Sequence, residues 1–234
     1  MRIVVFPGVL KPPTDCRLLA RAVAERGLSR EASALDVFTG SGALALAVAA
    51  QGAREVVAVD ISRRAVANAR LNAILNGVRV DVRRGDLFEP VAGRRFDLIV
   101  ANPPYVPSEA PELPASGPSR AWEAGVDGRA FLDRLCAGAT EHLAPGGSVA
   151  IVQSSLCGEE ATLTALRRTG LESRVIARRR GPLGPIAASR VEALERRGLL
   201  RPGEREEELL VIQGTRARDR AQPAGGTPAA KAIA

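Results

Sequence analysis

Short apolar runs alternate with longer segments of helical periodicity along most of this chain, and this alternation constrains its fold more than any other feature. The runs are rich in Val, Leu and Ala and are too short to form helices of their own. Strands are predicted at residues 34–38, 55–60, 79–83, 96–101 and 148–153, and helices at 15–26, 43–51, 62–76 and 127–143. This order predicts a parallel sheet with right-handed crossovers.

Two more strands are predicted at residues 171–177 and 208–213, with a helix at 189–197 between them. The chain is therefore expected to be an α/β protein with a Rossmann-like sheet of seven strands, mostly parallel, and helices on both faces. A long Pro-, Ser- and Ala-rich loop at 106–125 is expected to be functional or mobile. The predicted domain plan is an N-terminal extension with a helix at 1–30, the α/β domain at 31–214 and a disordered tail at 215–234.

The charge balance is basic, with 33 Lys and Arg residues against 26 Asp and Glu residues. A basic chain can bind nucleic acid, but the arginines are scattered in the way expected of an ordinary solvated surface. The odd set of Cys16, Cys136 and Cys157 fits no metal spacing and indicates reduced thiols in a cytoplasmic protein without a metal site. No apolar stretch approaches the ~20 residues of a membrane span, so a membrane partner is not expected.

The segment after the first predicted strand reads DVFTGSG and runs from Asp36 to Gly42. Gly40 and Gly42 permit a tight turn and a close approach of the backbone to a ligand. Asp60 ends the next strand, where a carboxylate can bind the two hydroxyls of a ribose. These features fit a dinucleotide and S-adenosylmethionine about equally well. Asp36 favours S-adenosylmethionine, because a carboxylate there repels a diphosphate and can anchor a positively charged amino-acid group, directly or through water.

A third acid, Asp86, follows the third predicted strand and can accept a hydrogen bond from an adenine amino group. The three acids then lie at three successive strand ends, along the edge where α/β sheets bind ligands. The sequence therefore predicts a site for S-adenosylmethionine.

The motif NPPY follows the fourth predicted strand and comprises Asn102, Pro103, Pro104 and Tyr105. The two prolines fix two φ angles and remove two N–H donors, so the loop is stiff and presents mainly acceptors. The Asn102 side-chain oxygen and the Pro103 carbonyl can hold both hydrogens of an –NH2 group, and Tyr105 can pack against a planar target. These four residues are the predicted catalytic loop of a nitrogen methyltransferase, in which positioning carries much of the rate.

Several of these motifs together resemble the HemK family of protein methyltransferases, over about residues 12–214. They are the DVFTGSG loop, Asp60, the GDL at 85–87, the NPPYVP at 102–107 and the AWEAGVDGR at 121–129. The resemblance implies a class I methyltransferase fold. It also implies a set of cofactor-binding positions: Cys16, Asp36, Phe38, Thr39, Gly40, Ser41, Gly42, Asp60, Ile61, Asp86, Leu87 and Asn102.

The segment PPTDCRLL at residues 12–19 is similar to the short branch of this family, which lacks an N-terminal helical domain. Cys16 stands where a Thr is usual in that branch, and Phe38 where many methyltransferases have Gly. The resemblance implies methylation of a glutamine amide, with the Gly-Gly-Gln loop of a translation release factor as the expected substrate. It also implies a possible small zinc-binding activator subunit.

Three other hypotheses stay open at this stage. Some short-branch members resemble lysine methyltransferases, although the motif shows no base to deprotonate an ammonium group. NPPY is also shared with RNA and DNA amino-group methyltransferases, which would explain the basic charge but would need a target-recognition domain. A cofactor-binding subunit without catalytic activity is the third hypothesis, and the intact NPPY motif argues against it.

Overall fold

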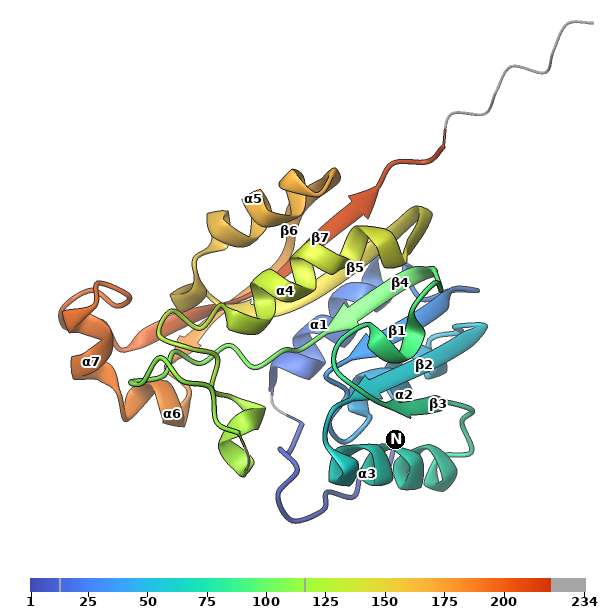
Figure 1. Ribbon diagram of the computed structural model, residues 1–234, viewed down its shortest axis with the longest axis horizontal. Helices are drawn as coiled ribbons and strands as arrows, with labels where there is room; N and C mark the ends of the chain where they lie inside the picture. Colours follow the sequence, from blue (N-terminus) through green and yellow to red (C-terminus); the bar gives the residue numbers. More distant parts are fainter. Residues whose placement is uncertain (13, 116, 220–234) are drawn as a thin grey trace, which may run out of the picture.

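A seven-stranded sheet lies at the centre of the computed structural model, which describes residues 1–12, 14–115 and 117–219 (Figure 1). Its strand order is β3-β2-β1-β4-β5-β7-β6. The strands are β1 (Ser33–Val37), β2 (Glu55–Asp60), β3 (Asp81–Arg84), β4 (Phe96–Ala101), β5 (Leu143–Ser154), β6 (Leu171–Pro182) and β7 (Glu206–Arg216). The first five strands are parallel, and β7 pairs antiparallel with β5 and β6. The predicted fold class is confirmed.

Helices cover both faces of the sheet. One face carries α1 (Thr14–Glu25), α2 (Ala43–Ala50) and α3 (Arg63–Leu75), and the other carries α4 (Ala130–Ala139) and α5 (Glu159–Arg168). Two short helices, α6 (Pro185–Ala188) and α7 (Val191–Arg196), precede β7. The 3-10 turns are η1 (Glu89–Val91), η2 (Pro118–Ala121), η3 (Thr140–His142) and η4 (Ser155–Cys157).

The strands read as continuous apolar runs because the sheet is buried on both faces. In β4, Ile99 and Ala101 pack in the cluster beneath α4 and α5, whereas Leu98 and Val100 pack in the cluster beneath α1, α2 and α3. The α1 helix contributes Leu19 to this second cluster. The predicted extension at residues 1–30 therefore shares the core of the main domain.

Two predicted boundaries and one missed helix need correction. The helix expected at residues 127–143 begins only at Ala130, because Gly128 has φ +73° and the Arg129 N–H bonds the side chain of Asp127. No helix was predicted at α5. The predicted tail at 215–234 starts inside β7, which continues to Arg216, and its residues 220–234 lie outside the described part of the chain. Among the described residues, no helix has the length and apolarity needed to cross a membrane.

The N-terminal segment runs along α3 and is held there by a ladder of three asparagines (Figure 1). The backbone N–H groups of Arg2, Val4 and Phe6 donate to the side-chain oxygens of Asn76, Asn72 and Asn68, at 2.8, 2.9 and 2.9 Å. The amide nitrogens of the ladder donate back to the Arg2 and Val4 carbonyls. Four residues of a helix rise about 6 Å, and two residues of an extended chain span about 6.6 Å. Asparagines spaced four apart on α3 therefore lie opposite every second residue of the N-terminal segment.

Replacement of the middle rung tests whether this ladder fixes the N-terminal segment. We expect Asn72→Ala to lower the free energy of unfolding by about 1–3 kcal/mol, because it leaves buried partners unsatisfied. Hydrogen exchange at the Val4 amide should accelerate as well. Ile74→Ala is the control, since Ile74 is exposed on the same helix and should change stability by less than about 0.5 kcal/mol. Unchanged exchange at Val4 in Asn72→Ala would refute the ladder.

Candidate active site

A cavity of about 780 Å³ lies at the carboxyl ends of β1, β2 and β4, where Val37, Asp60 and Asn102 line it. The chain leaves β1 toward β2 on one side and returns to β4 on the other, so the cavity lies at a topological switch point of the sheet. Its size falls within the roughly 300–1,000 Å³ that is typical of ligand pockets. All predicted cofactor-binding residues except Asp36 and Gly42 line it, namely Cys16, Phe38, Thr39, Gly40, Ser41, Asp60, Ile61, Asp86, Leu87 and Asn102.

Asp36 is fully buried beneath the cavity wall rather than on it. Its Oδ2 accepts hydrogen bonds from the Thr39 hydroxyl at 2.6 Å and from the Ala45 N–H at 2.9 Å. Its Oδ1 is buried with no partner among the described residues. Burial raises the pKa of Asp36 to about 7, against the lowering effect of these two donors. Asp36 therefore ties the loop to the start of α2, and its contact with a cofactor stays a prediction.

Gly42 also has a structural role. It has φ +83°, and a Cβ at this position would lie 3.0 Å from the Ala69 side chain on α3. Gly42 thus permits α2 to begin close against α3. A Cβ on Gly40, in contrast, would meet nothing within 4 Å, so the backbone there borders open space that a ligand can enter.

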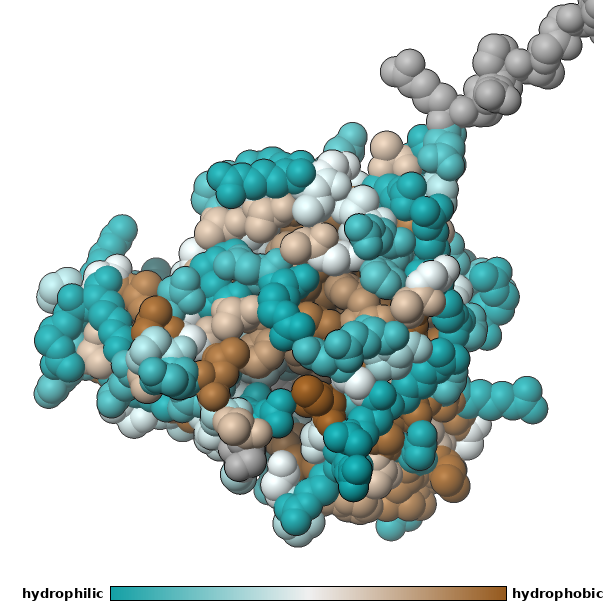
Figure 2. Space-filling view, in the orientation of Figure 1, coloured by the Kyte–Doolittle hydropathy of each residue, from teal (hydrophilic) through white to brown (hydrophobic). Residues whose placement is uncertain are grey.

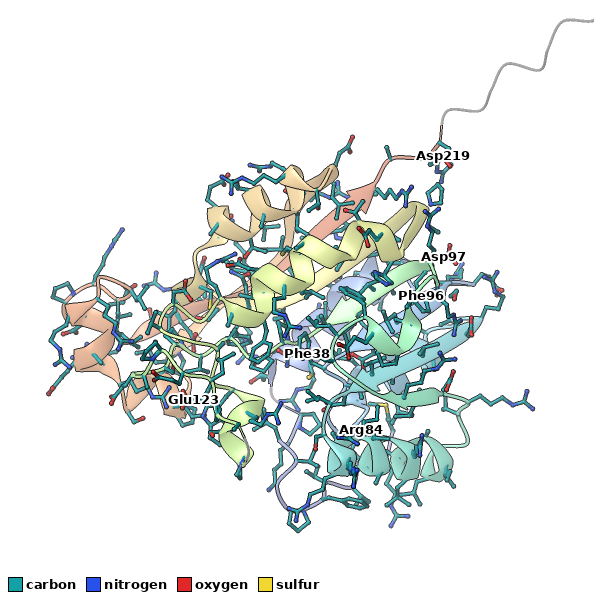
Figure 3. The ribbon with its side chains drawn as sticks, viewed as in Figure 1. Phe38, Arg84, Phe96, Asp97, Glu123 and Asp219 are labelled. Atoms are coloured by element: carbon teal, nitrogen blue, oxygen red, sulfur yellow. The ribbon has the colours of Figure 1, made fainter. Side chains whose placement is uncertain are left out.

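Phe38 takes the left-handed conformation that glycine adopts without strain, with φ +62°. Its ring packs edge-on against Phe131 of α4, with 5.7 Å between ring centroids, and lies below that helix in Figure 3. The turn therefore keeps the shape expected of a glycine, and the aromatic contact offsets part of the strain. The Phe131 ring is a part of the cavity wall that the sequence did not predict.

The two acids on the cavity wall differ in their partners. Asp60 accepts the N–H groups of Gly40 and Ser62 at 2.9 Å each, one on each carboxylate oxygen. Burial raises the pKa of Asp60, and these backbone donors oppose the shift. Because each carboxylate oxygen can accept more than one hydrogen bond, Asp60 retains acceptor capacity for a diol. Asp86 instead forms a 2.7 Å ion pair with Arg134, so any bond to an adenine amino group would share that carboxylate.

Two side chains of the NPPY loop form hydrogen bonds to the first turn of α1. The Nδ2 of Asn102 donates to the Cys16 sulfur at 3.3 Å, and the Tyr105 hydroxyl donates to the Asp15 carboxylate. Tyr105 packs against the core beneath α4 and α5, whereas Asn102 and Pro104 line the cavity. Tyr105 therefore braces the loop, and its packing against a planar target stays a prediction. Asp15 was missed as a site residue, although it stands in the PPTDCRLL segment next to Cys16.

The VDGR at residues 126–129 supports the same loop from the other side. A Cβ on Gly128 would clash with the Tyr105 carbonyl oxygen and lie 2.9 Å from the Cys157 sulfur. The Cys157 thiol donates to that same carbonyl at 3.0 Å, and Arg129 donates to the Cys157 carbonyl at 2.6 Å. This motif therefore shapes the backbone behind the catalytic loop.

Two further segments line the cavity, and neither was among the predicted binding residues. The N-terminal segment supplies Gly8, Val9, Leu10 and Pro12, just beyond the asparagine ladder. The long loop at 106–125 supplies further wall residues, and its Glu123, labelled in Figure 3, forms a 2.5 Å ion pair with Arg190. The loop was predicted as functional or mobile, and its contribution to the wall agrees with a functional role.

Comparison with known proteins places this geometry in a family. Residues 13–114 match the family described as Methyltransferase small domain. The chain is 36% identical over 182 residues to a provisionally named protein N5-glutamine methyltransferase of Methanocaldococcus jannaschii, which covers 78% of this chain and 90% of that protein. The chain belongs to the HemK family of S-adenosylmethionine-dependent methyltransferases.

Other HemK-family relatives are longer than the matched region. The chain is 39% identical over 173 residues to the release factor glutamine methyltransferase of Geobacter sulfurreducens, and the match spans 71% of this chain but 60% of that enzyme. A solved structure of the E. cuniculi Mtq2–Trm112 complex has the same fold, with a TM-score of 0.62 at 20% identity. The match covers 90% of this chain and 100% of that one.

The cavity of this HemK-family chain fits the family's cofactor, S-adenosylmethionine. We propose that Asp60 holds the ribose hydroxyls, because its carboxylate is fixed by two N–H groups and faces the cavity. Open space at Gly40 admits the ligand next to the backbone. When bound, the cofactor supplies a methyl group activated on a sulfonium. The NPPY residue Asn102 lines the same cavity, so a substrate nitrogen held there lies beside the cofactor site.

Two glycine variants test whether the VDGR turn supports the loop. Gly125 and Gly128 both have positive φ, so an alanine at either should cost about 1–2 kcal/mol in backbone strain. Only at Gly128 does the new Cβ clash with the Tyr105 carbonyl; at Gly125 its nearest contact is 3.7 Å away. We expect Gly128→Ala to lose a further ~1–3 kcal/mol of unfolding free energy in denaturant titrations. Equal losses of unfolding free energy in Gly125→Ala and Gly128→Ala would contradict the idea that the VDGR turn supports the loop.

The buried carboxyl of Asp36 predicts a pH dependence of stability. Between the ordinary value of 3.8 and about 7, the folded protein holds a proton on Asp36 that the unfolded chain releases. Stability should therefore fall as pH rises through this window, by on the order of 4 kcal/mol at most, and level off above it. Asp36→Asn should flatten this slope, leaving the smaller part due to the raised pKa of Asp60. Thermal unfolding measured from pH 4 to 8 checks this, and parallel curves for the two proteins would disprove it.

Proposed function

We propose that this protein methylates the side-chain amide nitrogen of a glutamine in a protein substrate, with the Gly-Gly-Gln loop of a translation release factor as the leading candidate. The main support for this proposal is that Asn102 lines the cofactor cavity while its loop is held by hydrogen bonds to α1 and is supported by the VDGR turn. The named activities of the M. jannaschii and G. sulfurreducens relatives support glutamine as the target. We place the reaction in the cytoplasm, where translation takes place.

The chemistry of the loop favours an uncharged amide over a lysine ammonium. An ammonium must lose a proton before its nitrogen can attack a methyl group. Burial raises the pKa of Cys16 to about 12 and raises the pKa of Tyr105 well above its ordinary value, so neither group acts as a base near neutral pH. A glutamine amide needs no prior deprotonation. Its delocalised lone pair needs positioned acceptors for its two hydrogens, and the Asn102 oxygen and Pro103 carbonyl supply them.

A nucleic-acid amino group is the second candidate. It is favoured by four arginines on the cavity wall, Arg63, Arg64, Arg120 and Arg134. Two of these are already engaged, since Arg134 pairs with Asp86 and Arg120 donates to the Ala115 carbonyl. On the face shown in Figure 2, hydrophilic side chains are interspersed with hydrophobic patches. A protein substrate is therefore the stronger proposal.

A small zinc-binding activator subunit is a further part of this proposal. It rests on the family resemblance and on the E. cuniculi structure, in which Mtq2 is in complex with Trm112. Activity is therefore best measured both with the isolated chain and in cell extract, where such a subunit would be present.

Methyl transfer from radiolabelled S-adenosylmethionine tests the substrate. The three substrates are a release factor with its Gly-Gly-Gln loop, the same factor with that glutamine changed to lysine, and ribosomal RNA. We expect label in the first alone. We expect Asn102→Ala to lower kcat by at least about 100-fold, because an acceptor that stabilises the transition state is lost. Label in RNA alone would overturn the glutamine proposal, and an undiminished kcat in Asn102→Ala would overturn the role of the loop.

Cofactor binding is the control for the Asn102 variant. Because Asn102 also lines the cofactor cavity, calorimetry measures the dissociation constant for S-adenosylmethionine in Asn102→Ala, and kcat is compared with that of the unaltered protein at saturating cofactor. A variant that binds the cofactor but does not transfer methyl separates loss of catalysis from loss of folding.

A further inference from the structure

The first turn of α1 and the catalytic loop hold each other through two consecutive residues. Asp15 accepts a hydrogen bond from the Tyr105 hydroxyl, and Cys16 accepts one from Nδ2 of Asn102 at 3.3 Å. These contacts join segments that lie 90 and 86 residues apart in the chain. The Asp15 contact fixes the far end of the loop, and the Cys16 contact fixes the residue that faces the cavity.

We propose that Cys16 is a positioning residue that sets which end of the Asn102 amide faces the substrate. This inference rests on the proposed function of the loop. The two ends of an asparagine amide have nearly the same shape but opposite hydrogen-bonding character. A sulfur that accepts from Nδ2 holds the donor end against α1 and leaves Oδ1 as the end available to the cavity. Within the described residues, Oδ1 of Asn102 accepts no hydrogen bond from the protein.

The orientation matters because the substrate nitrogen brings hydrogens with it. With Oδ1 toward the cavity, Asn102 offers an acceptor for one hydrogen of a primary amide, and the Pro103 carbonyl is the predicted acceptor for the other. With the amide reversed, the donors on Nδ2 would face the donors of the substrate. That arrangement loses a hydrogen bond and misdirects the nitrogen lone pair, on which the rate of transfer depends.

The Cys16 side chain is suited to this role and to no direct chemical one. Burial raises the pKa of its thiol to about 12, and the hydrogen bond from Asn102 opposes that shift. The thiol is therefore uncharged near neutral pH and is not a nucleophile or a base. A neutral sulfur is a weak acceptor. The preference that it imposes on Asn102 is accordingly modest, and a single substitution can remove it.

The kinetic test uses three variants. Cys16→Ala removes the acceptor, Cys16→Ser restores an acceptor oxygen, and Cys136→Ala is the control because Cys136 is a buried free thiol in α4 that is not among the residues lining the cavity. We expect kcat for glutamine methylation to fall about tenfold in Cys16→Ala and to recover in large part in Cys16→Ser. Because Cys16 also lines the cofactor cavity, the dissociation constant for S-adenosylmethionine is measured in each variant and kcat is compared at saturating cofactor. Cys136→Ala should keep the unaltered kcat.

A second readout reports on Asn102 without any substrate. In the unaltered protein, the contact with sulfur should slow solvent exchange of the Asn102 side-chain amide hydrogens, as followed by nuclear magnetic resonance. Exchange should accelerate in Cys16→Ala and stay slow in Cys16→Ser and Cys136→Ala. This readout tests the positioning contact even if the true substrate is not a glutamine.

The outcomes separate the two proposals. Unchanged kcat together with unchanged exchange in Cys16→Ala overturns the positioning role, as does an equal loss of kcat in Cys136→Ala. If no glutamine substrate is methylated but exchange still accelerates in Cys16→Ala, the proposed function fails and the positioning contact is supported. If Cys16→Ala does not fold, the test relies on Cys16→Ser. Fast solvent exchange of the Asn102 side-chain hydrogens in folded Cys16→Ser would then overturn the proposal.

Discussion

Two consecutive prolines leave the catalytic loop without a backbone donor at Pro103 or Pro104, and much of the surrounding structure holds this loop from outside. Ordinary loops are fixed by their own N–H groups, which this one lacks at its centre. The loop depends instead on its side chains and on the Tyr105 carbonyl. Elements that are distant in sequence, α1 and the η4 residue Cys157, provide the partners. A stiff presentation of acceptors to a substrate is thus obtained through tertiary contacts.

The cavity also separates residues that face a ligand from residues that hold the wall. Asp36 and Gly42 belong to the glycine-rich loop by sequence, but one lies buried under the loop and the other packs against α3. Asp60 and Gly40, from the same motif, line the cavity. A motif therefore combines two kinds of constraint, and its residues are not equivalent in function. Both carboxyls carry a cost in desolvation, since burial raises the pKa of Asp36 beneath the loop and of Asp60 on the wall.

Much of this arrangement could be predicted from the sequence, for identifiable reasons. Apolar runs such as residues 55–60 and 96–101 predict buried strands because both faces of the sheet are covered. Strand order then brings Asp60 and Asn102 to one edge. The short α5 was missed because its apolar side is limited to Leu163 and Leu166 beside a buried Thr162.

Other features could not be predicted, because they depend on contacts between distant segments. The contact of Cys16 with Asn102 and the wall formed by residues 8–12 require the folded geometry. A predicted helix begins later than expected, at Ala130, because the left-handed backbone of Gly128 fits against the Tyr105 carbonyl. A helix-period pattern carries no sign of that constraint.

The asparagine ladder on α3 bonds the backbone of the N-terminal segment and none of its side chains. It therefore fixes the register of this segment along the helix. Each rung bonds alternate peptide groups, and a slip by one residue would place none of the donors opposite an acceptor. A slip by two would restore the rungs but would carry residues 8–12 about 6.6 Å along the helix and away from the cavity. The segment can therefore vary in composition at positions 2, 4 and 6, provided that none becomes proline. The length of chain between the ladder and Pro12, by contrast, sets where residues 8–12 meet the cavity.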